Sequence, residues 1–100
     1  MREGLDQETL TIFDLLKSGK MLNDSELKEV KKVAAETLEK LKTLKLNIER
    51  WRESRQVTSQ VKTMIFDHLQ WLPQPVYSDQ DVFDKTGQVY QHVYTYYAGV

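Results

Sequence analysis

Residues 47–73, NIERWRESRQVTSQVKTMIFDHLQWLP, carry one helical pattern from end to end. Side chains of one face recur there at the three- and four-residue spacing of an α-helix; they are Trp51, Thr58, Val61, Ile65, Leu69 and Leu72. Pro73 cannot continue the hydrogen-bond ladder of a helix. We therefore predict a single helix over residues 48–72.

Three more apolar side chains of this segment, Met64, Phe66 and Trp71, fall outside that face. A helix that is apolar on several sides is usually buried from several directions. Either another helix of the same chain or a partner protein should cover them, and we favour the chain's own last helix.

Two helices are predicted before this segment. Asn23 and Glu26 have the spacing of a capping box, which begins a helix over residues 24–44. Its apolar stripe has helical spacing and consists of Leu27, Val30, Ala34, Leu38, Leu41 and Leu44. Gly19 stands where a helix-terminating glycine belongs, so a first helix is predicted over residues 6–18.

A last helix is predicted after a short extended connector at Pro73 and Pro75. Ser78 is its N-cap, and the helix spans residues 79–97. Its apolar side chains gather within about a third of the helix circumference; they are Val82, Phe83, Thr86, Val89, Tyr90, Val93 and Tyr97. We see no strand pattern of useful length, so the fold class is all-α: a compact bundle of about four helices forming one domain over residues 1–100.

Composition narrows the classes of function. The 100 residues contain no cysteine, which excludes disulfides, thiolate metal sites and thiol catalysis. No apolar run approaches the roughly 20 residues that span a bilayer, and a net charge of −1 argues against general binding to nucleic acid. We expect a cytoplasmic protein with no membrane contact.

Catalytic and metal-binding patterns are weak. Asp79, Asp81 and Asp84 lack the glycine and the distal glutamate of a calcium loop, and acids are favoured in the first turn of a helix. His68 and His92 have no neighbour at ligand spacing. No glycine-rich phosphate loop exists among the four glycines. We expect no catalytic residue, no cofactor and no metal in this chain.

The middle of the chain is basic, with ten bases against five acids over residues 28–62. Arg52, Arg55 and Lys62 should share one side of the predicted third helix, within about 80° of one another. Arginine suits bidentate pairing with carboxylate or phosphate. The alternative is a set of ordinary surface ion pairs with glutamates such as Glu49 and Glu53.

Aromatic residues complete the candidate contact surface. Tyr90 and Tyr97 fall on the apolar stripe of the last helix, whereas Tyr94 and Tyr96 should be exposed. Trp71 lies at the end of the third helix. Aromatic side chains beside arginine can stack on single-stranded bases, but packing in the core or in a protein interface is favoured here.

The order of these features resembles the C-terminal helical domain of the R subunit of type I restriction–modification enzymes. The resemblance covers residues 4–97. It rests on GLDQETLTIFDLL at residues 4–16, LNDSELKEVKKVAAETLEKLK at 22–42, ERWRESRQVTSQVKTMIFDHL at 49–69, the Leu-Pro that follows, Tyr77, and VYQHVYTYY at 89–97.

The resemblance implies a parent machine that binds DNA, uses ATP and Mg²⁺ to translocate it, and cuts far from its recognition site. The nuclease and motor domains would lie upstream, so this chain would be a C-terminal fragment with no catalytic residue of its own. Its expected role is to dock the motor subunit onto the methyltransferase and specificity subunits. An accessory module that contacts DNA phosphates and a structural cap on the motor remain alternatives. The candidate contact residues are Arg52, Arg55, Lys62, Trp71, Tyr94 and Tyr96.

Overall fold

The computed structural model describes residues 7–46, 48–73 and 76–97, and it confirms the all-α fold class. The described residues form four α-helices and a short 3-10 helix, η2, with no strand; they are α1 Gln7–Lys17, α2 Asp24–Leu44, η2 Trp51–Glu53, α3 Arg55–Leu69 and α4 Asp79–Tyr96.

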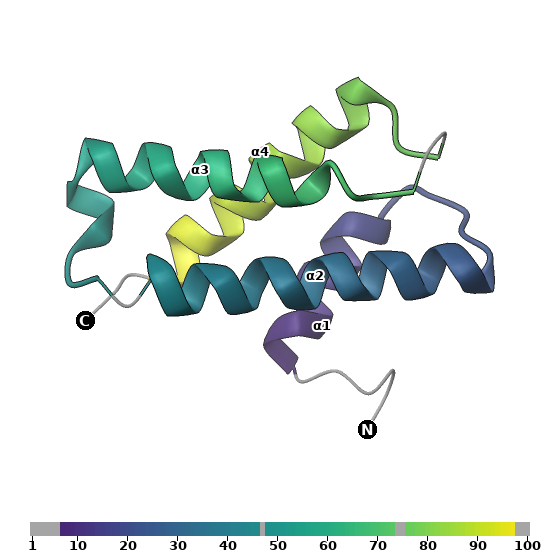
Figure 1. The fold of residues 1–100 in the computed structure, drawn as a ribbon, viewed down its shortest axis with the longest axis horizontal. Helices are drawn as coiled ribbons and strands as arrows, with labels where there is room; N and C mark the ends of the chain where they lie inside the picture. The colour runs from purple at the N-terminus through teal and green to yellow at the C-terminus, as the bar shows by residue number, and fades with distance from the viewer. Residues whose placement is uncertain (1–6, 47, 74–75, 98–100) are drawn as a thin grey trace.

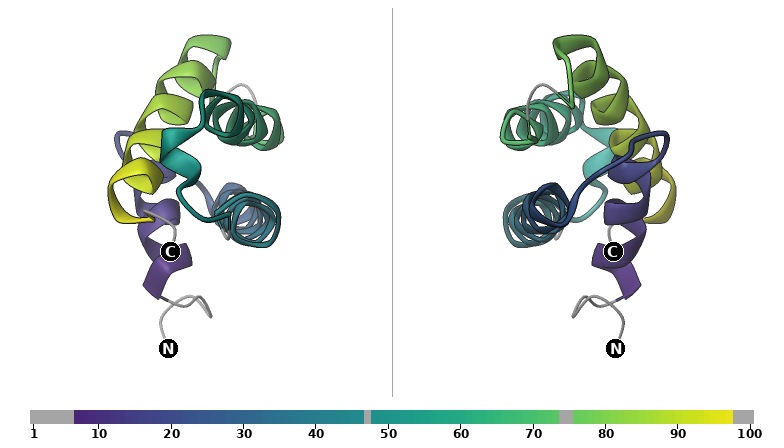
Figure 2. Two further views of the ribbon diagram at one scale, coloured as in Figure 1. Left: turned by 90° about the vertical axis from the view of Figure 1, so that its left-hand side faces the viewer. Right: turned by 90° about the vertical axis from the view of Figure 1, so that its right-hand side faces the viewer.

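The helices pack in two layers. In Figure 1, α2 and α3 run side by side, while α1 crosses α2 and α4 crosses α3. Figure 2 shows α2 and α3 nearly end-on in one layer, with α1 and α4 in the other. Among the described helices, none combines the length and apolar character that crossing a membrane requires.

Local capping signals explain where α2 and α4 begin. The Asn23 side chain accepts the Glu26 backbone N–H at 2.8 Å, and the Glu26 carboxylate accepts the Asn23 N–H at 2.9 Å. Ser78 and Asp81 form the same reciprocal pair at the start of α4. These caps satisfy backbone donors that the first helical turn leaves unpaired. Gly19 adopts a φ of 78°, as expected for a glycine that terminates a helix.

The predicted single helix over residues 48–72 is wrong at both ends. Arg50 adopts a left-handed φ of 57°, and Trp51–Glu53 form η2. Ser54, with a φ of −100°, then caps α3, and its hydroxyl accepts the Val57 N–H at 3.2 Å. The break turns Trp51 inward, where its side chain is fully buried and its indole N–H donates to the Tyr97 carbonyl.

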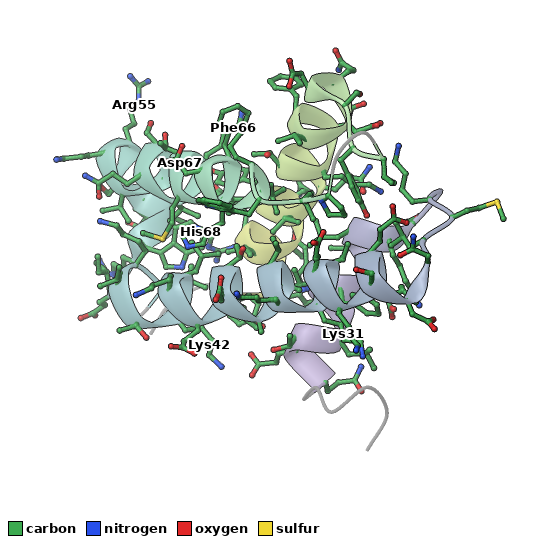
Figure 3. All side chains as sticks on the ribbon, turned by 45° about the vertical axis from the view of Figure 1, so that its right-hand side comes forward. Lys31, Lys42, Arg55, Phe66, Asp67 and His68 are labelled. Carbon is green, nitrogen blue, oxygen red and sulfur yellow. The ribbon has the colours of Figure 1, made fainter. Side chains whose placement is uncertain are left out.

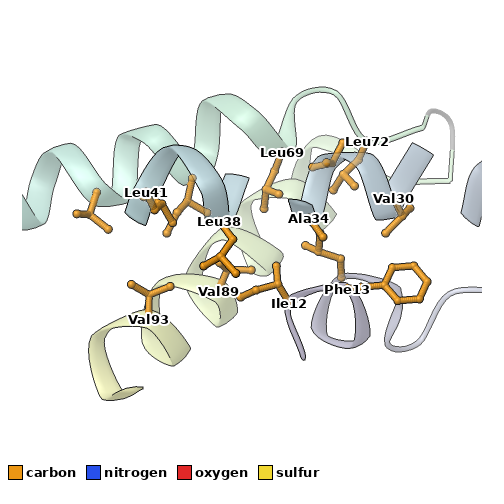
Figure 4. Close-up of a cluster of buried hydrophobic side chains, with 14 of the residues drawn as sticks. Ile12, Phe13, Val30, Ala34, Leu38, Leu41, Leu69, Leu72, Val89 and Val93 are labelled. Atoms are coloured by element: carbon orange, nitrogen blue, oxygen red, sulfur yellow. The ribbon is translucent and has the colours of Figure 1, made fainter. Parts of the chain in front are cut away.

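One hydrophobic cluster joins all four helices. Figure 4 shows Ile12 and Phe13 of α1 near Ala34 and Leu38 of α2, with side chains of α3 and α4 completing the cluster. Removing this apolar surface from water supplies the main force for folding. The cluster makes the chain one packing unit over its described residues.

Two residues that were predicted to lie on buried apolar stripes are exposed in the structure. Phe83 of α4 is 60% exposed, and Leu44 at the end of α2 is half-exposed. In place of Phe83, the buried side of α4 contains Lys85, whose ammonium donates to the carbonyls of Leu15 and Ser18 at 2.9 and 2.8 Å. The lysine thereby caps α1, a long-range contact that hydrophobic periodicity does not reveal.

Candidate interaction surface

Arg52 is placed by η2 and not by α3, so the predicted arrangement of three bases on one helix face is wrong. Its Nη1 donates to the Tyr94 carbonyl at 2.9 Å, and its guanidinium lies 5.3 Å from the centre of the Tyr94 ring. Tyr94 also meets Trp51 edge-on, with ring centres 6.0 Å apart. The break before α3 thus joins two of the candidate contact residues, Arg52 and Tyr94.

Lys62 makes the second contact of this kind. Its ammonium lies 5.9 Å from the centre of the Tyr90 ring, and the Tyr90 and Tyr94 rings are 5.9 Å apart. The two tyrosines are neighbours because they are four residues apart on α4. We call Arg52, Lys62, Tyr90 and Tyr94 the cation–aromatic surface. It lies where η2 and α3 meet α4.

Arg55 extends the charge of this surface. It is the first residue of α3, it is exposed, and it points away from the body of the domain (Figure 3). Within the described chain, the Arg55 guanidinium has no ion-pair or hydrogen-bond partner, and Glu53 faces Arg50 at 4.0 Å instead. The alternative, in which Arg52, Arg55 and Lys62 form ion pairs with Glu49 or Glu53, is therefore not observed in the part of the molecule described.

Tyr96 is 72% exposed but belongs to another side of α4. Its ring lies 4.9 Å from that of His92, and both line a surface cavity of about 520 Å³ beside α1. The Tyr97 hydroxyl donates to Glu8 at 2.6 Å next to this cavity. Burial lowers the pKa of His92 below its usual value. Tyr94 and Tyr96 are both exposed, as predicted, but they do not form one site.

Trp71 lies beyond the end of α3 and is 79% exposed. Phe66 is 40% exposed, whereas Met64 is half-buried against the core. Burial of all three by the chain's own last helix was the favoured expectation, and it is wrong for Trp71 and Phe66. Trp71 instead borders a second cavity, of about 380 Å³, next to α2.

The acidic residues Asp81 and Asp84 accept hydrogen bonds near the N-terminal end of α4. Asp81 accepts hydrogen bonds from Ser78 N–H and Lys20 Nζ at 3.0 and 2.6 Å, and Asp84 accepts one from Gln80. Over residues 7–46, 48–73 and 76–97, no group of three or more metal-ligating side chains converges. The geometry therefore provides surfaces for recognition, with charged and aromatic groups already positioned.

Sequence reasoning missed the part that Tyr90 plays, because Tyr90 had been assigned to the core. Its side chain is half-buried, packs against the core and also presents its ring to Lys62. The four-residue spacing from Tyr94 was the available signal.

Comparison with known family models, curated proteins and solved structures gives no match to this chain.

Proposed function

We propose that this chain is a non-catalytic assembly domain of a type I restriction enzyme R subunit. It would dock the ATP-dependent translocase and endonuclease onto the methyltransferase–specificity core in the cytoplasm. ATP, Mg²⁺ and the cutting chemistry would belong to other domains of the parent. The sequence resemblance supports the family, and the cation–aromatic surface is the observation that carries the docking role.

The surface suits protein recognition for physical reasons. Tyrosine and arginine supply most of the energy in many protein interfaces, because each combines a large contact area with directed polar groups. Arg52 is held over Tyr94 and Lys62 over Tyr90, so part of the ordering cost is met before binding. Arg55, exposed beside them, is available to a carboxylate of the partner.

The test is binding of this chain to the purified methyltransferase–specificity core without DNA, measured by calorimetry. Charge reversal of the two most exposed cations, Arg55→Glu with Lys62→Glu, should weaken binding at least tenfold. The matched control reverses two exposed lysines of α2, Lys28→Glu with Lys40→Glu, and should bind like the wild type. Far-ultraviolet circular dichroism should show equal helix content in all three proteins. Absence of binding by the wild type, or equal binding by the two double variants, contradicts the proposal.

Contact with DNA phosphates is the second candidate, favoured by the absence of a carboxylate partner for Arg55 and Lys62 among the described residues. It predicts binding to a duplex of arbitrary sequence. Affinity would fall by orders of magnitude between low and moderate salt if several phosphates are neutralised. A domain that only caps the motor would bind neither the core nor the duplex.

A further inference from the structure

A notch lies beside α2 near the C-terminal end of α3. Its cavity of about 380 Å³ is lined by Trp71 and by four residues of α2; they are Glu29, Lys32, Val33 and Glu36. The four are spaced at i, i+3, i+4 and i+7, so they share one side of the helix. We call this site the tryptophan notch.

The tryptophan itself is unusual for a folded domain. Trp71 is 79% exposed, whereas Trp51 is fully buried. Its backbone is nevertheless fixed, because its N–H donates to the His68 carbonyl at 3.1 Å and Leu72 and Pro73, which follow it, are buried. Tryptophan is the side chain whose ring attracts a cation most strongly, and this indole is open to solvent.

Two carboxylates flank this platform. Glu29 and Glu36 are exposed, and neither has an ion-pair or hydrogen-bond partner in the described chain. Lys32 stands between them, so the charged side chains of the lining sum to one negative charge. Val33 is buried and supplies an apolar floor for the methylenes of an incoming side chain.

We propose that the tryptophan notch binds the side chain of an arginine from a partner protein. The guanidinium stacks on the Trp71 indole and pairs with the carboxylate of Glu29 or Glu36. Arginine fits better than lysine because its planar group can stack and form two parallel hydrogen bonds at once.

The notch is independent of the cation–aromatic surface. Lys62 is the member of that surface on α3, and it lies seven residues before the helix ends at Leu69, about 10 Å along the axis at 1.5 Å per residue. Their chemistry is also opposite, since one surface presents cations and the other presents carboxylates. Failure of the docking proposal therefore leaves the arginine proposal standing, and the reverse also holds.

The test follows the two indole N–H signals in a ¹⁵N-correlated NMR spectrum of the whole chain. The probe is the peptide acetyl-Gly-Arg-Gly-amide, and the control peptide replaces arginine with citrulline, which has the same shape without charge. The arginine peptide should shift the Trp71 signal saturably and leave Trp51 unmoved. The citrulline peptide should bind at least tenfold more weakly.

Variants of the notch test whether its carboxylates attract a positively charged side chain. Glu29→Gln with Glu36→Gln should abolish the Trp71 shift, whereas Glu39→Gln, an exposed control on the same helix, should leave it unchanged. Lys32→Gln removes the competing cation and should tighten binding severalfold, an effect that partial unfolding cannot imitate. Weaker binding by Lys32→Gln, equal binding of the two peptides, or no shift with the arginine peptide would each overturn the proposal.

Discussion

Lys85 shows how a single charged residue orients one helix against another. Only 6% of it is exposed, and its ammonium meets the C-terminal carbonyls of α1 at Leu15 and Ser18. A helix leaves its last carbonyls unpaired and carries partial negative charge there. Burial, followed by the charge of Lys20, lowers the pKa of Lys85. Its position in the core is thus explained by the end of α1.

Asp81 is the residue whose charge most clearly depends on folding. The hydrogen bond from Lys20, followed by the backbone hydrogen bond from Ser78, lowers the pKa of Asp81 from 3.8 to about 2. A carboxyl whose pKa is lower in the folded state stabilises the fold above its unfolded pKa. That stability is lost as the pH falls from about 4 to about 2, because the unfolded chain takes up the proton first.

We therefore expect Asp81→Asn to flatten the dependence of stability on pH over that interval. The measurement is the urea midpoint of unfolding between pH 2 and pH 6, for the wild type and the variant. Asp67→Asn is the control, since Asp67 is exposed and has no partner among the described side chains. If Asp81→Asn keeps the acid-induced loss of the wild type, the Lys20–Asp81 pair does not cause it.

At the scale of the element, the break before α3 matters most. Ser54 ends η2 and begins α3, and its hydroxyl satisfies the Val57 N–H. Replacing an N-cap serine by alanine costs about 1 kcal/mol of folding free energy. Ser54→Ala should lower the free energy of unfolding by about that amount in urea denaturation.

Ser59→Ala is the matched control because Ser59 is exposed inside α3. Alanine is the better helix former there, so this variant should be unchanged or slightly more stable. Equal loss of stability in the two variants would mean that Ser54 has no capping role and that the break has another cause.

Helix bounds that depend on local sequence signals were predicted correctly, and those that depend on distant contacts were not. The start of α2 was predicted to the residue because both members of its capping box lie within four residues of each other. The start of α3 was missed because Trp51 keeps helical spacing with the residues after it. Its actual position depends on the contact with Tyr97, 46 residues away.

For the candidate contact residues, exposure could be predicted from the sequence, but their pairing across helices could not. Exposure of Tyr94 and Tyr96 follows from their positions on α4, and it was predicted. The pairing of Arg52 with Tyr94 and of Lys62 with Tyr90 was not, because it depends on how far α3 and α4 slide along each other. Hydrophobic periodicity gives the faces of two helices but not their relative register.

At the scale of the whole molecule, hydrogen bonds link α1 to residues of the last quarter of the chain. The Tyr77 hydroxyl donates to the Leu16 carbonyl at 2.6 Å, and the Tyr97 hydroxyl donates to Glu8. Burial raises the pKa of Tyr77 to about 12. A tyrosine hydroxyl with its ordinary pKa already keeps its proton in the neutral range, so it remains a donor there. Together with Lys85, these contacts hold α1 against α4. The helix α4 of this layer contributes Tyr90 and Tyr94 to the cation–aromatic surface.

A single core and these long-range ties predict one cooperative unfolding step. In a Trp71→Phe variant, tryptophan fluorescence reports only on Trp51, which packs where η2, α3 and α4 meet. Far-ultraviolet circular dichroism reports on all four helices. The exposed Trp71 contributes little packing, so the variant should keep its stability. For a two-state domain the urea transitions from the two probes coincide.

Earlier exposure of Trp51 would instead identify the junction before α3 as a separate unit, which opens while the rest of the bundle stays folded. Such opening would also release Arg52 from Tyr94, so the same measurement decides whether the cation–aromatic surface is rigid before it meets a partner.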